Sequence, residues 1–226
     1  IRSDILINYS LVRRFCEQYN KPFWTFMQAG GNWNGDANWR IINEGEMWGQ
    51  ISTALAFGAK GYEFYPYNCP PECVNSPEGD EGLVGRGGQK NAGWYHAQNA
   101  NAQTQACDHI LMKSVHKGII HVKSGKEDST NKLEMPAIET SGLNGKFNEV
   151  KSITGDNSIT GCFNYKGKTM LYVVNNSITL DKAKVTINCD GKQNYTVIQR
   201  GVERKASGSK LELTFAPGEG ACVVIG

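Results

Sequence analysis

The sequence predicts an α/β part over residues 1–118 and an all-β part over residues 119–226. Two observations support this prediction. In the first part, stretches with apolar residues at helical spacing alternate with short, dense apolar runs of strand length. After Gly118 the apolar spacing changes to two, and turn signals separate short runs rich in β-branched residues. A chain of 226 residues suffices for one large or two small domains.

The first predicted helix covers residues 5–20, where apolar residues recur at helical spacing. Lys21-Pro22 ends this helix, because the residue before a proline avoids helical dihedral angles. The run 23–27 is apolar and short enough to be a buried strand. A loop rich in glycine and asparagine follows over residues 29–38.

A second helix is predicted over residues 43–57, with Glu44 and Glu46 near its positive N-terminal end. A second strand over 61–67 and, after a long loop, a third helix over 94–113 complete the first part. Strands that are separated by crossover helices run parallel in one sheet. The order of these elements therefore predicts a parallel sheet.

The second part is predicted to be an antiparallel β-structure, preceded by a linker over residues 124–148. The predicted strands are 158–165, 169–175, 183–188, 195–200, 210–215 and 220–225. The turn signals between them include Lys166-Gly167, Asp190-Gly191 and Pro217-Gly218.

The composition argues against two classes of partner. Hydrophobic residues make up 39% of the chain and charged residues 20%, which is ordinary for a globular protein. Apolar runs such as Met170–Val174 are strand-sized, far short of the ~20 residues that a bilayer requires. The net charge of +2 is spread without a basic stripe. We therefore expect neither a membrane nor a nucleic acid as partner, and neutral polar substrates remain compatible.

No cofactor and no metal are predicted. The sequence has no phosphate loop and no dinucleotide-binding glycine fingerprint. Among the seven cysteines, Cys69 and Cys73 form the only close pair, and neither a second pair nor a histidine pair completes a zinc site. A local disulfide or two free thiols is the favoured interpretation.

The predicted parallel strands lack partners within the sequence. A parallel strand needs neighbours at both edges and helices on both faces, and two such strands with three helices cannot bury a core alone. The remaining strands are expected on upstream sequence or on a second chain, unless the chain is a truncated remnant. The chain begins with Ile1 and has no leader after it, and we expect a piece of a longer protein.

Three motifs carry a resemblance to a known family. They are Pro22–Gln28 with its Phe-Trp pair, Met47–Gly61 with its Ala-Leu-Ala-Phe-Gly-Ala-Lys-Gly stretch, and Tyr62–Tyr65. Together they resemble the end of bacterial barrel glycoside hydrolases of the β-galactosidase-like kind. The tail from Leu171 is similar to the small β domain that closes many of these enzymes. The resemblance implies the last βα units of a (β/α)8 (TIM) barrel followed by a small antiparallel β-sandwich. It also implies a secreted or periplasmic location.

The resemblance implies an active site at the C-terminal mouth of the barrel strands. Glycoside hydrolysis commonly uses two carboxyl groups. If the strand at 23–28 is the seventh, the nucleophile position falls at or near Gln28, which is an amide. Either the catalytic pair lies on earlier strands outside this chain, or the parent protein is not a catalyst of the usual type. The catalytic residues are thus unknown, with Glu63 as a candidate.

Seven residues are predicted to contact a carbohydrate, because indole and phenol rings stack on sugar C–H faces while amides and carboxylates bind hydroxyls. They are Gln28, Trp33, Asn34, Glu63, Tyr65, Tyr67 and Asn68. Alternation along the second strand would direct Glu63, Tyr65 and Tyr67 to one face. Glu63 has a second interpretation, as a structural carboxylate paired with an upstream cation, and Trp33 has one as a loop-packing residue.

The expected function is therefore part of a glycoside hydrolase that acts on O-glycosidic bonds of oligo- or polysaccharides. The expected partners are the carbohydrate substrate and the remainder of the barrel, and the chain alone is expected to be inactive. The alternative is a non-catalytic carbohydrate-binding or scaffolding protein built on a degenerate barrel.

Overall fold

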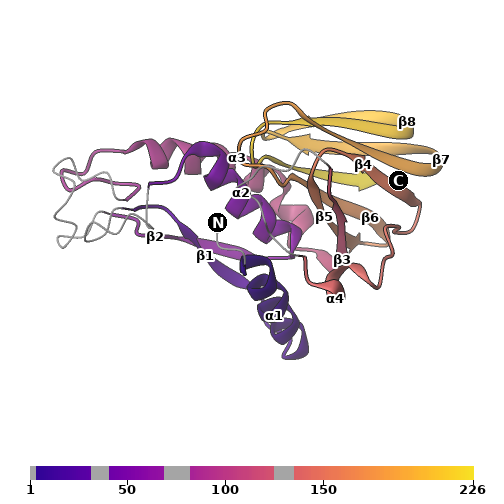
Figure 1. The fold of residues 1–226 in the computed structure, drawn as a ribbon, viewed down its shortest axis with the longest axis horizontal. Coiled ribbons are helices and arrows are strands. Elements are labelled where there is room, and N and C mark those ends of the chain that lie inside the picture. The colour runs from indigo at the N-terminus through magenta and orange to yellow at the C-terminus, as the bar shows by residue number, and fades with distance from the viewer. Residues whose placement is uncertain (1–3, 32–40, 69–81, 125–134) are drawn as a thin grey trace.

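The computed structural model describes residues 4–31, 41–68, 82–124 and 135–226. The first part has helices and strands in the predicted alternating order (Figure 1). Its elements are α1 (Ile5–Gln18), β1 (Trp24–Gln28), α2 (Glu44–Ala56), β2 (Gly61–Tyr65) and α3 (Ala92–Leu111). The remaining elements are β3 (Ser114–Val122), α4 (Ala137–Thr140), β4 (Val150–Gly155), β5 (Ser158–Tyr165), β6 (Lys168–Asn175), β7 (Ala183–Gln199), β8 (Val202–Phe215) and β9 (Gly220–Ile225).

Strands β1 and β2 form a parallel pair, as the crossover helix between them predicts. Trp24 is opposite Gly61 at one end of the pair, and Gln28 is opposite Tyr65 at the other. Helix α2, which connects the strands, begins with a capping box. The Glu46 amide donates to Asn43 Oδ1 at 3.0 Å, and the Asn43 amide donates to Glu46 Oε2 at 2.9 Å. Glu46 is therefore a helix-start residue, which was its sequence interpretation.

Helix α2 is buried almost all round because it packs on two layers at once. It contacts β1 on one side and strands β5, β6 and β9 of the large sheet on the other. Figure 1 shows α2 between the strand pair and that sheet. Small residues make the close packing possible: a Cβ on Gly45 would lie 2.8 Å from both Ile178 O and Pro217 Cβ. The alanine- and glycine-rich stretch of α2 thus reflects contact on all sides.

The second part is a large antiparallel sheet of seven strands in the order β3-β5-β6-β9-β7-β4, with β8 on β7. The prediction of a turn at Asp190-Gly191 between two short strands is wrong. Residues 183–199 form the single strand β7, and a register shift against β8 lies between Asn188 and Gln193. Residues 189–192 thus form an irregular stretch in the pairing with β8, and they do not end the strand. The first half of β7 pairs with β4, and its second half pairs with β9.

Strand β3 begins at Ser114, immediately after α3, and runs through residue 118, where the sequence predicts the boundary between the two parts. A single apolar cluster joins Leu6 and Phe57 on one side of that boundary to Phe163 and Tyr172 on the other. The helices therefore pack directly on the sheet. The division into domains 1–118 and 119–226 stays a prediction.

A second apolar cluster fills the other face of the sheet. It includes Val150, Leu171, Val197 and Phe215, all at most 1% exposed. Strands β3 and β4 stand at opposite ends of the strand order, yet they contact each other. The sheet therefore curls around this second cluster, and the two clusters account for its two apolar faces.

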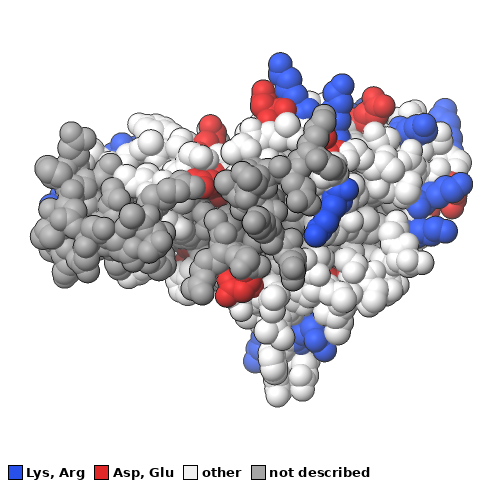
Figure 2. All heavy atoms as spheres, viewed as in Figure 1, with Lys and Arg blue, Asp and Glu red and all other residues white. Residues whose placement is uncertain are grey.

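The outer surface of the described residues carries interspersed basic and acidic side chains on the face in Figure 2. Among the described helices, none is both long enough and apolar enough to cross a bilayer.

Candidate functional site

The C-terminal ends of β1 and β2 bring several predicted site residues together. Gln28 and Tyr65 are opposite each other at the last paired position. Helix α2 fixes this end, because the Gln28 amide donates to Gln50 Oε1 at 2.8 Å. The Gln28 side chain donates to Gly30 O at 3.0 Å. Gln28 thus supports the loop that follows β1, and Gln50 is a positioning residue that the sequence did not identify.

Side chains alternate between the two faces of the strand pair. Tyr62 and Phe64 face α3, and the Tyr62 hydroxyl lies 2.7 Å from Asn101 Oδ1. Burial and loss of hydration raise the Tyr62 pKa. Glu63 and Tyr65 lie on the opposite face and are exposed, as is Tyr67 beyond the strand end.

The exposed face of the strand pair is rich in aromatic residues. Trp24, Phe26 and Tyr65 are 55%, 66% and 56% exposed there. The Glu63 carboxylate lies on the same face, and it makes no hydrogen bond or ion pair with the part of the chain that the structure describes. An aromatic row with a carboxylate in it is suited to contact a sugar ring or another layer of protein.

Tyr67 and Asn68 follow β2 at the same end. Tyr67 O accepts a hydrogen bond from the Val84 amide at 2.9 Å, and Asn68 pairs with Val84 in a parallel bridge. The Tyr67 ring is edge-on to Trp94 at 6.0 Å, beside a groove of about 360 Å³. The predicted residues Trp33 and Asn34 lie outside the described residues, as do Cys69 and Cys73. Within the described residues, no group of three or more His, Cys, Asp or Glu side chains is arranged to hold a metal.

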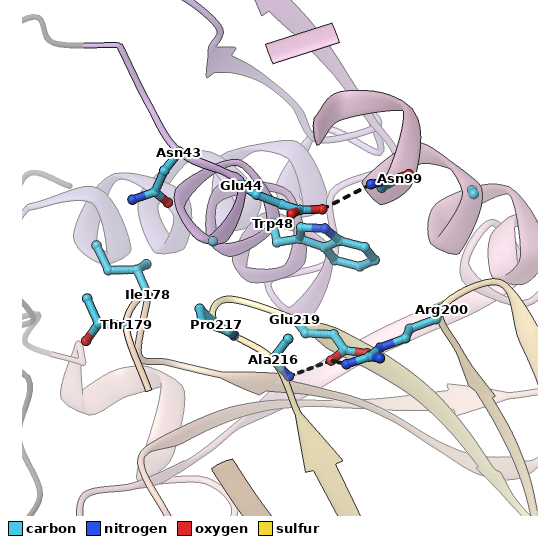
Figure 3. A pocket seen from close by; sticks show the side chains of 12 residues that line it. Asn43, Glu44, Trp48, Asn99, Ile178, Thr179, Arg200, Ala216, Pro217 and Glu219 are labelled. Carbon is cyan, nitrogen blue, oxygen red and sulfur yellow. Dashed lines mark hydrogen bonds and ion pairs between the residues drawn. The ribbon is translucent and has the colours of Figure 1, made fainter. Parts of the chain in front are cut away.

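A larger cavity, of about 790 Å³, lies away from the strand ends, between helices α2 and α3 and the turns of the large sheet (Figure 3). Sequence reasoning did not identify it. Five chain segments supply its walls: Asn43 to Trp48, Asn99 and Ala102, Ile178 and Thr179, Arg200, and Ala216 to Glu219. We refer to it as the interface cavity.

Charged groups line the interface cavity on two sides. Glu44 Oε1 accepts a hydrogen bond from Asn99 Nδ2 at 3.0 Å. Across from them, the buried Glu219 accepts from Arg200 Nε at 2.9 Å and from the Ala216 amide at 2.6 Å. The pKa of Arg200 is raised, mainly by the hydrogen bond to Glu219 and next by the negative charge of Glu219. The negative charge of Glu44 makes a smaller contribution in the same direction.

Gln103 joins α3 to the β7–β8 turn beside the interface cavity. This fully buried side chain donates to Ile198 O at 3.0 Å and accepts from the Gly201 amide at 2.9 Å. Gln103→Leu should reduce the free energy of unfolding by about 1–3 kcal/mol, because it leaves a carbonyl and an amide without partners. Urea unfolding measures the loss. Gln105→Leu, at an exposed position of the same helix, should change stability by less than about 0.5 kcal/mol. Equal effects of the two substitutions would contradict the bridging role.

Comparisons with known proteins give a likeness in structure only. No family model matches the chain, and no curated protein matches it. Similar solved structures include a glycoside hydrolase (TM-score 0.49, 10% identity), which covers 100% of this chain and 47% of its own. A family 5 glycoside hydrolase from Bacteroides vulgatus has a TM-score of 0.47 and 12% identity, and it covers 100% of this chain and 46% of its own.

An Anoxybacillus α-amylase has a TM-score of 0.48 and 11% identity, with 100% of this chain and 46% of its own covered. The chain thus spans about half the length of these solved structures. All three are glycoside hydrolases, and their TM-scores lie under 0.5.

Proposed function

We propose that this chain is the C-terminal part of a (β/α)8-barrel glycoside hydrolase of the β-galactosidase-like kind. Its substrates are O-glycosidic bonds of oligo- or polysaccharides. Residues 1–118 supply the last βα units of the barrel, and residues 119–226 supply an accessory β-sandwich. A secreted or periplasmic location fits this substrate class.

One observation carries the proposal: the strand pair β1–β2 is covered by helices on one face and leaves Trp24, Phe26, Glu63 and Tyr65 exposed on the other. Parallel strands are normally buried on both faces and paired at both edges. A closed barrel supplies both the missing neighbours and a lumen that this face lines.

Helix α1 supports the same arrangement. Its outward surface exposes Ile7, Leu11, Val12 and Phe15, each more than 40%. A patch of this composition is suited to pack against a neighbouring helix. In a barrel, adjacent outer helices provide that neighbour, so the remainder of the barrel is the proposed partner of both surfaces.

In the proposed enzyme, Gln28, Trp33, Asn34, Tyr65, Tyr67 and Asn68 contact the sugar at the mouth. Glu63 lies in the lumen, where it orients a catalytic group or binds a sugar hydroxyl. The two carboxyl groups of the reaction are supplied from other strands, because an amide occupies the end of β1. That amide also favours the second candidate function, a carbohydrate-binding or scaffolding protein on a degenerate barrel.

The test compares this chain with the longer protein obtained by including the coding sequence upstream of Ile1. The longer protein should hydrolyse chromogenic galactosides or glucosides, and the 226-residue chain alone should not. Glu63→Gln and Gln28→Ala in the longer protein should each lower kcat/KM by about ten- to a hundredfold, because misplaced contacts at a reaction centre cost that much. The matched control is Glu203→Gln, which removes an exposed carboxylate paired with Lys205 on β8.

Turnover by the chain alone would refute the need for further barrel strands. Unchanged kcat/KM in both variants would remove β1 and β2 from the site. A longer protein that binds oligosaccharides but hydrolyses none of these substrates would establish the second candidate function instead.

A further inference from the structure

We propose that the interface cavity is a second carbohydrate-binding site, one that takes a neutral oligosaccharide and does not take part in bond cleavage. The ligand class is inferred from the chemistry of the cavity walls. The link between this site and polysaccharide processing rests on the proposed function. It is built by α2, α3 and the sheet turns, whereas the strand-end residues Gln28, Tyr65 and Tyr67 are not among its lining residues.

The cavity has the size and lining of a small-molecule site. Its volume of about 790 Å³ lies within the ~300–1,000 Å³ typical of such sites. Ala102, Ile178, Ala216 and Pro217 give it apolar walls, which suit the C–H faces of a sugar ring.

Trp48 supplies an unpartnered donor. Trp48 belongs to α2, and the residue is only 9% exposed. The Trp48 Nε1 atom has no hydrogen-bond partner among the described residues, and it is not fully buried. The indole N–H therefore keeps some accessible surface, and Trp48 is one of the residues that line the cavity. In Figure 3 the indole lies between Glu44 on one side and the Arg200–Glu219 pair on the other.

Donors and acceptors alternate around the cavity. Arg200 uses Nε and Nη2 to hold Glu219, which leaves its Nη1 without a partner among the described residues. Glu44 uses Oε1 to accept from Asn99. Each sugar hydroxyl both donates and accepts, so a wall that offers indole and guanidinium donors beside a carboxylate acceptor suits neighbouring hydroxyls.

The charges favour a neutral ligand over an anionic one. Glu44 and Glu219 carry two negative charges against the single positive charge of Arg200, and Glu219 is only 2% exposed. An acidic sugar would need a cation that is not already paired. Arg200 is engaged by Glu219, and Glu44 would repel a second carboxylate.

The elements that build the cavity walls contact one another directly. A Cβ on Gly218 would lie 2.0 Å from Gly45 O, so the β8–β9 turn is in direct backbone contact with α2. Gln103 ties α3 to the β7–β8 turn that carries Arg200. The elements that carry Glu44, Trp48 and Arg200 are therefore tied to one another, while the Arg200 side chain itself is 64% exposed.

The test uses the indole N–H resonances of the five tryptophans in the ¹⁵N-labelled 226-residue chain. Comparison with Trp48→Phe identifies the Trp48 resonance. Maltotriose, cellotriose and xylotriose are the neutral probes, and trigalacturonate is the acidic one. At least one neutral trisaccharide should shift the Trp48 resonance, and titration of that shift gives the Kd.

Arg200→Met should weaken this binding by about three- to tenfold, the loss expected for one hydrogen-bonding side chain. Arg204→Met, which removes an exposed arginine from β8 outside the cavity lining, is the matched control and should leave the Kd unchanged. Asn99→Ala, at an exposed position of α3, gives a second cavity variant that does not depend on the Arg200–Glu219 ion pair.

The proposal is overturned if no neutral trisaccharide shifts the Trp48 resonance, or if trigalacturonate alone does. Shifts confined to Trp94, which lies against Tyr67, would overturn it while leaving sugar contact at the strand ends intact. A shift of Trp48 together with an inactive longer protein would retain this site and reject the proposed hydrolase.

Discussion

Gly218→Ala should destabilise the chain by about 3–5 kcal/mol, which combines a backbone cost and a steric cost. Gly218 has φ of +65°, a conformation that an L-residue with a side chain adopts at a cost of about 1–2 kcal/mol. Its added Cβ would lie 2.0 Å from Gly45 O and 2.5 Å from Gly49 N. These are backbone atoms of α2, which cannot move aside without separating the helix from the sheet. Urea unfolding followed by circular dichroism measures the loss.

Gly167→Ala is the matched control for Gly218→Ala. Gly167, in the β5–β6 turn, has φ of +82°, but nothing lies within 4 Å of an added Cβ. It therefore bears the backbone cost alone, about 1–2 kcal/mol. The difference between the two variants isolates the contact between α2 and the β8–β9 turn. Equal losses would mean that this contact is absent in solution.

Glu139→Ala should cost about 3 kcal/mol or more, because it leaves Arg13 without its buried counter-charge. The Glu139 side chain is 1% exposed, and its Oε1 lies 2.6 Å from Arg13 Nη2, whose side chain is 12% exposed. Ser10 donates to the same carboxylate. This cluster joins α1 to α4, across more than 120 positions of sequence. Loss of stability in urea unfolding tests the prediction.

Glu17→Ala is the control for the cluster. Glu17 also pairs with Arg13, at 2.7 Å, but its side chain is 50% exposed. Exposed ion pairs contribute about 1 kcal/mol or less, because water screens the charges. If the two substitutions cost the same, the Arg13–Glu139 pair does not anchor α1.

Local patterns predicted the elements of the first part well. The residues that begin α2, Asn43 and Glu46, cap it through neighbours three positions apart, so the sequence contains the whole interaction. The turn at Lys166-Gly167 is local in the same way, with the Gly167 amide donating to Asn164 Oδ1 at 3.1 Å. Such features depend only on residues three positions apart in the sequence.

Predictions failed where distant residues decide the outcome. Asp190-Gly191 has turn chemistry, but pairing of β7 with β8 on both sides of it keeps the chain in the sheet. Strand β3 lies against β5, yet the sequence assigned no strand to residues 114–122, which closely follow a helix. In both cases, hydrogen bonds to a partner strand outweigh the local preference.

For the candidate sites too, the sequence predicted the features that depend on local spacing and missed those that depend on distant residues. The sequence predicted which strand-end residues lie near each other, because parallel strands place their C-terminal ends at one edge, and Gln28 is indeed opposite Tyr65. It did not predict Gln50, whose contact with Gln28 depends on how α2 crosses β1. Nor did it predict the interface cavity, whose lining residues lie more than 170 positions apart in sequence.

By itself, then, the sequence determined the three long helices, most of the strands, the parallel pair and the face of that pair to which Glu63 and Tyr65 belong. These follow from the spacing of side chains along a helix or a strand. Only the tertiary structure decided that α2 is buried between two layers, that the sheet curls on itself, and that Trp48 meets Arg200 and Glu219 around one cavity. These depend on close approach of backbones, such as Gly218 against Gly45, and no spacing within a single segment encodes such contacts.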